Sequence, residues 1–267
     1  MDNYKIILDL CGGSGSWSRP FTRAGYDVRL LTLPKYDVTK IKKTYLLGVP
    51  CLWLENETKT CPDRFETIPI DRVWGILAAP PCTEFSVLNC KAEPRQRKPD
   101  EGMVVVNACL QIIEWCQPEW WAMENPVGYL REYLGEPTLT FQPWEYGDPW
   151  TKRTDIWGEF NIPVKPYKRW EDVPDKLPLY TRPGRGKPNF AYLHKAAHKD
   201  IPQLAFATPK TDADFRAITP PGFAQAFYEA NKHTEGAEKG LEKIIERRRS
   251  QARENTARQN PGHSNGK

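Results

Sequence analysis

The stretch YKIILDLCGGSG, residues 4–15, decides the fold class that this sequence predicts. Its apolar run, residues 4–10, has the length of a buried strand and stops at a glycine-rich turn. Helical composition follows at residues 17–24, and a second apolar run spans residues 26–33. Glycines let such a turn bend sharply and present backbone amides at the start of a helix. This order predicts an α/β domain with a Rossmann-like, doubly wound mixed sheet that binds ligands at the carboxyl ends of its strands.

The rest of the chain first extends this pattern and then departs from it. Further strands are predicted at residues 73–79 and 120–123, and further helices at residues 103–116, 128–134 and 223–232. Residues 40–69 give no clear assignment. Residues 143–209 are rich in proline, aromatic residues and cations and show little periodicity, which is typical of a recognition surface built from loops.

Composition and cysteine spacing argue against a secretory signal, a membrane span and a metal site. The first residues carry charges and only a short apolar run, so we expect no secretory signal, no membrane span and a cytoplasmic location. Seven cysteines without a CxxC pair predict free thiols, Cys51 and Cys61 included, and no metal site. The net charge of +4 is mild, and much of the basic excess lies in residues 235–267, where it could add affinity for phosphates.

A cysteine lies directly after one of the predicted strands. The segment APPCTEFS, residues 79–86, places Cys82 behind two prolines, which stiffen the approach to it. A thiol at the edge of a ligand crevice can act as a nucleophile, whereas a core cysteine is inert. The inert case is the commoner one for any single cysteine.

A carboxylate occupies the corresponding place after the next predicted strand, because Glu124, Asn125 and Pro126 follow residues 120–123. Neighbouring Cys82 and Glu124 would form a nucleophile and a proton donor, provided that burial raises the pKa of the carboxyl group. An N-cap at Asn125 with Pro126 in the first turn is the alternative interpretation, and the two are compatible.

In their order along the chain, these motifs resemble those of the C5-cytosine-specific DNA methyltransferases, especially the short members found in phages and prophages. The resemblance runs from Asp9 to about Asn231. It rests on the glycine turn, Asp37-Val38-Thr39, Pro80-Pro81-Cys82 with Phe85-Ser86, Glu124-Asn125, Tyr146-Gly147-Asp148-Pro149 with Lys152-Arg153, and Arg216-Ala217-Ile218-Thr219-Pro220. Each motif is modest alone, but the series is hard to produce by chance.

The resemblance implies a class I methyltransferase that uses S-adenosylmethionine and acts on a cytosine flipped out of duplex DNA. The implied catalytic residues are the nucleophile Cys82, Glu124 at cytosine N3 and Arg153 at cytosine O2. The implied cofactor-binding residues are Asp9, Cys11, Gly13, Gly15, Trp17, Asp37, Pro80 and Asn231. The implied substrate-binding residues are Ser86, Asn125, Trp150 and Lys152.

The same resemblance divides the chain of 267 residues, which is long enough for one α/β core and a small lobe. We expect a catalytic, cofactor-binding domain at residues 1–158 and a small irregular target-recognition region at 159–210. A helix at 211–234 would return to the catalytic domain, and the basic tail at 235–267 would be flexible. We expect a monomer.

The sequence departs from the family in three places. Leu31-Thr32-Leu33 supplies no acidic residue for the cofactor ribose. Trp150-Thr151-Lys152-Arg153 matches the usual Gln-x-Arg-x-Arg segment well only at its last arginine, so the flipped base could depend more on Trp150 and Lys152. The recognition region is short, which predicts a short target or relaxed specificity. Its cations and aromatic residues suit phosphates and bases, and His194 and His198 are interpreted as surface or DNA contacts.

Two alternatives stay open. The same chemistry could act on RNA or on a free cytosine nucleotide, which would explain the small recognition region. A family member without turnover could bind nucleic acid or cofactor only, although retention of both Cys82 and Glu124 argues against it.

Overall fold

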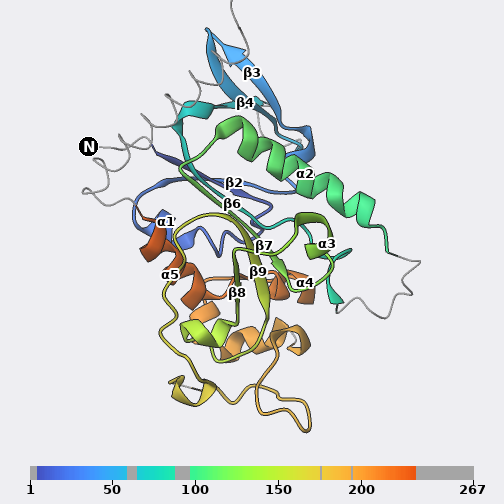
Figure 1. Cartoon of the computed structure of the whole chain (residues 1–267), viewed down its shortest axis with the longest axis vertical. Coiled ribbons are helices and arrows are strands. Elements are labelled where there is room, and N and C mark those ends of the chain that lie inside the picture. Colours follow the sequence, from blue (N-terminus) through green and yellow to red (C-terminus); the bar gives the residue numbers. More distant parts are fainter. Residues whose placement is uncertain (1–4, 59–64, 88–96, 175, 194, 233–267) are drawn as a thin grey trace, which may run out of the picture. The chain divides into compact units, whose positions relative to one another are not determined.

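The computed structural model describes residues 5–58, 65–87, 97–174, 176–193 and 195–232. Its main element is a six-stranded sheet with the strand order β2-β1-β6-β7-β9-β8 (Figure 1). The strands are β1 (Ile6–Leu10), β2 (Asp27–Leu31), β6 (Val73–Ala78), β7 (Trp120–Pro126), β8 (Leu139–Phe141) and β9 (Thr154–Glu159). The first four strands in that order are parallel, and β9 is antiparallel to both of its neighbours. The predicted mixed sheet is confirmed.

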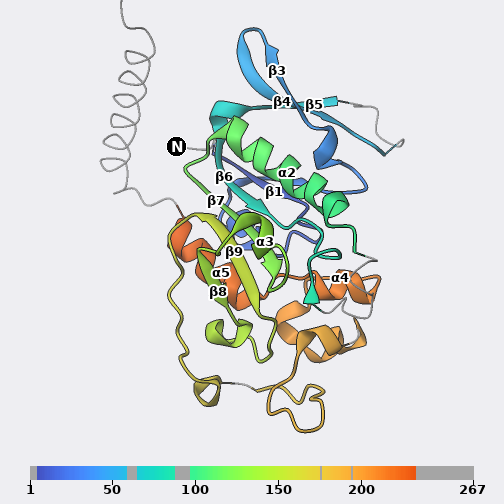
Figure 2. The same ribbon diagram turned by 45° about the vertical axis from the view of Figure 1, so that its right-hand side comes forward.

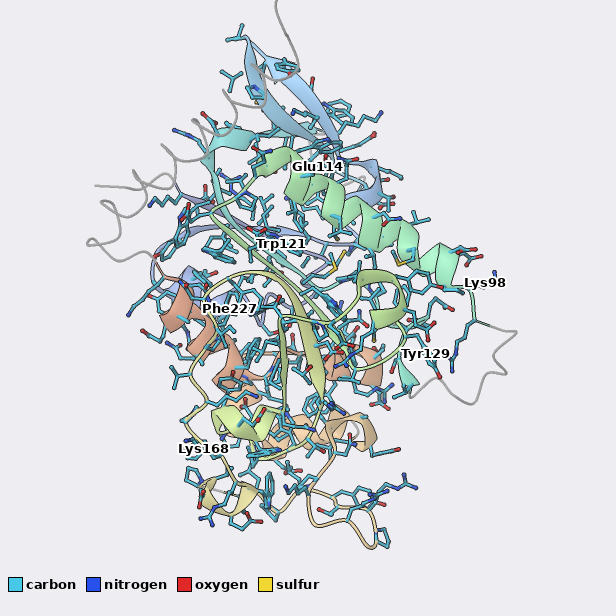
Figure 3. All side chains as sticks on the ribbon, viewed as in Figure 1. Lys98, Glu114, Trp121, Tyr129, Lys168 and Phe227 are labelled. Atoms are coloured by element: carbon cyan, nitrogen blue, oxygen red, sulfur yellow. The ribbon has the colours of Figure 1, made fainter. Side chains whose placement is uncertain are left out.

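Side chains of β1 alternate between two hydrophobic cores, as the strand period of two requires. Ile6, Leu8 and Leu10 belong to the core that helix α2 (Pro99–Cys116) covers. Ile7 belongs to the opposite core, which helices α1 (Arg19–Arg23) and α5 (Pro221–Asn231) cover (Figure 2). Within that core Phe227 of α5 packs between the helix and the sheet, with its ring 5.4 Å from the ring of Trp17 (Figure 3). Helices on both faces make the sheet doubly wound.

A second, three-stranded antiparallel sheet forms within residues 40–69, to which no secondary structure was assigned from the sequence. It consists of β3 (Lys42–Leu46), β4 (Val49–Glu55) and β5 (Phe65–Pro69). Leu52 and Leu54 of β4 join the core under α2, which attaches this sheet to the main one. The hairpin turns at Leu47 and Gly48, whose φ angles are 50° and 83°.

The loop-rich part of the chain is organised by a third group of buried side chains, which we call the Trp150 cluster. Its members are Trp150, Leu179, Phe190, Leu193, Ile201, Leu204, Ala207, Phe215 and Ile218. Helix α4 (Asp212–Arg216) contributes Phe215, and the other described segments of the cluster are mainly short 3-10 turns. The cluster therefore begins before residue 159 and continues beyond residue 210.

The predicted helices at residues 103–116 and 223–232 correspond to α2 and α5, and that at 128–134 corresponds to the shorter α3 (Arg131–Leu134). Contacts divide the chain into Met1–Asn231 and Lys232–Lys267. Apart from Lys232, the second unit lies outside the described residues, as do Cys61, His194 and the side chain of His198. None of the helices in the described ranges combines the length and the apolar character needed to cross a membrane.

Candidate active site

Three strand ends meet at one edge of the main sheet. In the register of the parallel strands, Leu10 of β1 lies beside Ala78 of β6, and Ala78 lies beside Met123 of β7. The chain after β6 stays attached to both neighbours. Ala79 donates its amide to the Leu10 carbonyl at 2.9 Å, and the Asn125 side chain donates to the Pro80 carbonyl at 3.1 Å. The glycine turn, the Cys82 segment and Glu124 are thereby brought to the same edge.

The turn after β1 has an open, left-handed backbone. Cys11, Gly13 and Gly15 have φ angles of 57°, 53° and 66°, and the Gly15 amide donates to the Gly12 carbonyl at 2.9 Å. A Cβ at Gly13 would meet no atom within 4 Å, so the backbone there is accessible to a ligand.

Asp9 lies buried beneath this turn with one carboxylate oxygen unused. Ser18 donates its hydroxyl to Oδ2, while Oδ1 has no hydrogen-bond partner. A Cβ at Gly12 would lie only 2.0 Å from Oδ1, so glycine is required there to make room for the carboxyl group. Burial raises the pKa of Asp9 to about 6, against the hydrogen bonds from Ser18 that lower it. A cation or N–H donor would satisfy this oxygen.

Cys82 begins a tight turn in which the Phe85 and Ser86 amides donate to the Cys82 carbonyl at 3.1 and 2.8 Å. Ser86 is buried and forms an isolated antiparallel bridge with Gly128, just beyond β7. A side chain at Gly128 would collide with the Phe85 carbonyl, its Cβ lying 2.1 Å from the oxygen. The thiol segment is therefore held against the chain that carries Glu124.

Several charged groups influence the pKa of the Cys82 thiol. Burial raises the pKa of the thiol, the negative charge of Glu124 raises it further, and the positive charges of Lys152 and Arg216 lower it. Burial also raises the pKa of the Glu124 carboxyl, and Lys152 again opposes this. A thiol, a carboxyl group and two cations thus share one electrostatic environment. Arg216 was quoted in a motif, but its approach to Cys82 was not predicted.

Lys152 and Arg153 are adjacent in the chain, but their side chains have different surroundings. Lys152 is half-buried, donates its Nζ to the Ile218 carbonyl at 3.4 Å and its amide to Gln142 Oε1 at 3.1 Å. The Arg153 side chain is exposed, and its carbonyl accepts the Val127 amide at 3.0 Å. Lys152 is therefore the cation whose charge acts on both the Cys82 thiol and the Glu124 carboxyl group, and the contact of Arg153 with cytosine stays a prediction.

Three other predicted site residues, Trp150, Trp17 and Asn231, are buried and contact other parts of the chain. Trp150 and Trp17 are only 0% and 2% exposed, each within an aromatic core. Asn231 is buried and committed to hydrogen bonds, accepting the Asn161 amide at 2.8 Å and donating to the Asn161 and Phe227 carbonyls, both at 3.0 Å. Contacts within the chain therefore surround these three residues, and the ligand contacts assigned to them stay predictions.

Asp37 accepts the amide and hydroxyl of Thr39 at 3.0 and 2.7 Å, which caps the following 3-10 turn. Its contact with an adenine stays a prediction. Across the described part of the chain, no group of three or more His, Cys, Asp or Glu side chains could hold a metal ion.

Asp148, an acidic residue of the Tyr146-Gly147-Asp148-Pro149 motif to which no role was assigned, anchors helix α5. Asp148 is buried and accepts the Gly222 amide at 2.9 Å. Burial raises the pKa of Asp148 to about 8, against the backbone hydrogen bonds from Gly222 and Phe223. Ser16 of the glycine turn accepts the Thr219 amide at 2.8 Å, so the segment before α5 is tied to the turn as well.

The chain is similar in sequence to the type II methyltransferase M.DdeI of Desulfomicrobium norvegicum, with 30% identity over 125 residues. The match covers 46% of this chain and 28% of M.DdeI, so the chain spans a minor part of that relative. A crystal structure described as a DNA modification methyltransferase encoded within an E. coli prophage overlaps with a TM-score of 0.35 at 16% identity, over 59% of this chain and 49% of that one. No model of a protein family matches the sequence. The similarity to M.DdeI agrees with the resemblance found in the motifs.

Proposed function

We propose that this protein transfers a methyl group from S-adenosylmethionine to carbon 5 of cytosine in DNA. The observation that carries the proposal is the placement of Cys82 beside buried Glu124 and the cation Lys152, at the sheet edge next to the glycine turn. Sequence similarity to a type II methyltransferase supports it.

Cytosine C5 is too weak a nucleophile to accept a methyl group directly, so it needs activation from the protein. Addition of the Cys82 thiolate to C6 forms a carbon–sulfur bond and moves electron density through the ring to N3. Glu124, whose pKa is raised by burial, donates the proton that N3 then takes up. When the electron pair at C5 forms the bond to the methyl group, the N3 proton returns to Glu124. Loss of the C5 proton to a base and expulsion of the thiolate then restore the aromatic ring.

The two cations have a defined part in this scheme. Because Lys152 and Arg216 lower the pKa of Cys82, they favour the thiolate that must attack. The Lys152 ammonium group would also donate to cytosine O2, which the resemblance assigned to Arg153. C6 is covered in a stacked duplex, so the base must leave the helix, at a cost of a few kcal/mol, to reach these groups.

The residues around the glycine turn fit the proposed cofactor. The unpartnered Oδ1 of Asp9 suits the ammonium group of its methionine end, and the open backbone at Gly13 allows close approach. When bound there, S-adenosylmethionine supplies an electrophilic methyl group. The contact to its ribose has no assigned residue in this chain.

The decisive experiment incubates the purified protein with labelled S-adenosylmethionine and, separately, duplex DNA, single-stranded DNA, tRNA and dCMP. Transfer to duplex DNA that is lost in Cys82→Ala but kept in Cys51→Ala is expected, because Cys51 is a buried thiol of the second sheet. DNA with 5-fluorocytosine at the target should trap a covalent adduct, since the fluorine cannot leave as a proton does.

Each other outcome points to a different function. Transfer only to tRNA or dCMP would move the same chemistry to another substrate. Cofactor binding without any product would indicate a protein without turnover. An adduct that still forms with Cys82→Ala would refute the assignment of the nucleophile.

A further inference from the structure

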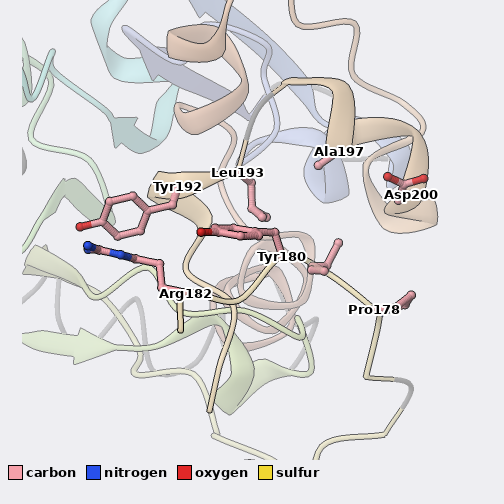
Figure 4. A pocket seen from close by; sticks show the side chains of 8 residues that line it. Pro178, Tyr180, Arg182, Tyr192, Leu193, Ala197 and Asp200 are labelled. Carbon is pink, nitrogen blue, oxygen red and sulfur yellow. The ribbon is translucent and has the colours of Figure 1, made fainter. Parts of the chain in front are cut away.

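The part of the chain built on the Trp150 cluster carries two adjoining hollows that the proposed chemistry does not use. The first, of about 640 Å³, is lined by Tyr180, Arg182, Tyr192 and Asp200 among others (Figure 4). The second, of about 460 Å³, is lined by Arg182, Tyr192, Arg185 and Lys187 among others. Arg182 and Tyr192 form the shared wall, with the guanidinium group 4.7 Å from the ring centre.

The first hollow offers aromatic faces, and the second offers positive charge. Tyr180 and Tyr192 are 60% and 41% exposed, so each ring presents surface on which a base could stack, although Arg182 already lies over one face of the Tyr192 ring. Among the described residues lining the two hollows, Arg182, Arg185 and Lys187 are cations and Asp200 alone is acidic. An aromatic compartment beside a cationic one matches the base and the phosphate of a nucleotide.

The position of the second hollow connects it to the active site. Thr151 lines this hollow, and its amide and carbonyl form hydrogen bonds with Pro188 and Phe190 at 2.8 and 2.9 Å. The next residue is Lys152, whose charge acts on Cys82 and Glu124. Because Thr151 and Lys152 are consecutive, the second hollow borders the segment that carries this cation.

We propose that the two hollows bind one nucleotide of the DNA strand that flanks the target cytosine. Its base stacks against Tyr180 and Tyr192, and its phosphate lies against Arg182, Arg185 and Lys187. Asp200 accepts a hydrogen bond from an amino group on the base. This inference rests on the proposed function in one respect, namely that the ligand is DNA.

The test measures binding of a fluorescent DNA strand and of the corresponding duplex by anisotropy, with the full chain. Tyr180→Ala and Tyr192→Ala should each weaken binding about 5- to 100-fold, the usual range for loss of one stacked base. Arg182→Ala should weaken it and reduce its salt dependence. Tyr180→Phe should keep the affinity, because the ring remains. Tyr45→Ala is the matched control, an equally exposed tyrosine on the hairpin of the second sheet.

Photocrosslinking identifies the residue in contact with the base. A strand in which thymine is replaced by 5-iodouracil should form adducts at Tyr180 or Tyr192 and none at Tyr45. Adducts confined to other aromatic residues, or wild-type affinity in both alanine variants, would overturn the proposal. So would binding of polyglutamate that depends on Arg182 as strongly as DNA binding does, with no effect of Tyr180→Ala, because it would indicate a merely electrostatic surface.

Methyl-transfer assays on the same preparations separate the two proposals. Normal transfer with unchanged DNA binding in the tyrosine variants would refute the nucleotide site alone. Stacking-dependent DNA binding without any transfer would refute the proposed reaction alone.

Discussion

Asp9 provides a quantitative test of the proposed cofactor site. Burial raises the pKa of its carboxyl group, and the buried oxygen Oδ1 has no hydrogen-bond partner. Without a ligand, burial holds the pKa of Asp9 near 6, so the carboxyl group is about nine-tenths protonated at about pH 5. A ligand ammonium group placed at Oδ1 would favour the ionised form and return the pKa to its ordinary range or below. Binding must then expel the proton at low pH, which costs affinity.

The magnitude follows from these values. If the pKa falls from about 6 to 3.8 or lower on binding, affinity should be about tenfold weaker at about pH 5 than at about pH 7. The ligand's own amino group, with a pKa near 7.7–8.0, stays protonated over this range. Binding at about pH 5 should also release about one proton per protein molecule.

Isothermal titration of S-adenosylmethionine at both pH values, in two buffers of different ionisation enthalpy, measures affinity and proton release together. Asp9→Asn can still accept the Ser18 hydroxyl and should bind about tenfold or more weakly, with no change between the two pH values. Equal affinity of the wild-type protein at both values would refute the reasoning. A pH dependence that persists in Asp9→Asn would assign it to another group.

Three further predictions concern other residues of the site and its support. Lys152→Met should reduce methyl transfer by about 100-fold or more and raise the pKa of Cys82, measured by the pH dependence of thiol alkylation, whereas Arg153→Met should alter turnover less than tenfold. Asp148→Asn should remove a pH dependence of stability. The raised pKa of about 8 stabilises the fold below the ordinary value of 3.8, and this stability is lost as pH rises through about 8, at up to about 1.4 kcal/mol per pH unit. Thermal melts at about pH 5 and 7 should therefore diverge in the wild-type protein and converge in the variant. Asn231→Ala should lower the free energy of unfolding, measured in urea, by about 1–3 kcal/mol, because it removes the hydrogen bonds that the buried Asn231 side chain makes with the backbone of Asn161 and Phe227. An unchanged urea midpoint would exclude that role.

The strands that could be predicted are those whose burial on both faces requires a continuous run of apolar residues. β1, β6 and the first half of β7 lie inside the sheet between two helical layers, so they appear as continuous apolar runs. β9 was missed because its sequence, TDIWGE, carries a buried Asp155 that is neutralised by Arg131 at 2.7 Å. A partner 24 positions away in the chain leaves no local signal.

The second sheet was missed for a different reason. β3 is almost wholly exposed, and its turn uses Leu47 in a left-handed conformation where Asn or Gly is usual. Among the described residues of its strands, Leu52, Leu54 and Ile68 are buried in the core that α2 covers. Such a sheet is held by contacts with α2, which periodicity within the segment does not reveal.

The candidate site shows the same division between local and distant causes. Cys82 and Glu124 could be paired from the sequence, since Cys82 follows β6 and Glu124 lies in the last part of β7, and parallel strands end at one edge. The choice between Lys152 and Arg153 could not be made this way, because both are long cations beside each other. It depends on distant partners of Lys152, whose ammonium group donates to the Ile218 carbonyl and whose backbone amide donates to Gln142 Oε1.

Three consecutive residues connect the recognition surface to the proposed chemistry. Trp150 is a core residue of the Trp150 cluster, Thr151 lines the cationic hollow, and Lys152 acts on the Cys82 thiol. Ile218, whose carbonyl accepts the Lys152 ammonium group, belongs to the same cluster. The Trp150 cluster thus holds Lys152 in two ways. Trp150 lies two residues before Lys152 in the chain, and the carbonyl of Ile218 accepts the Lys152 ammonium group. Any DNA contact that displaces this cluster must also move the cation that favours the thiolate, which provides a physical route by which sequence recognition could control attack on the base.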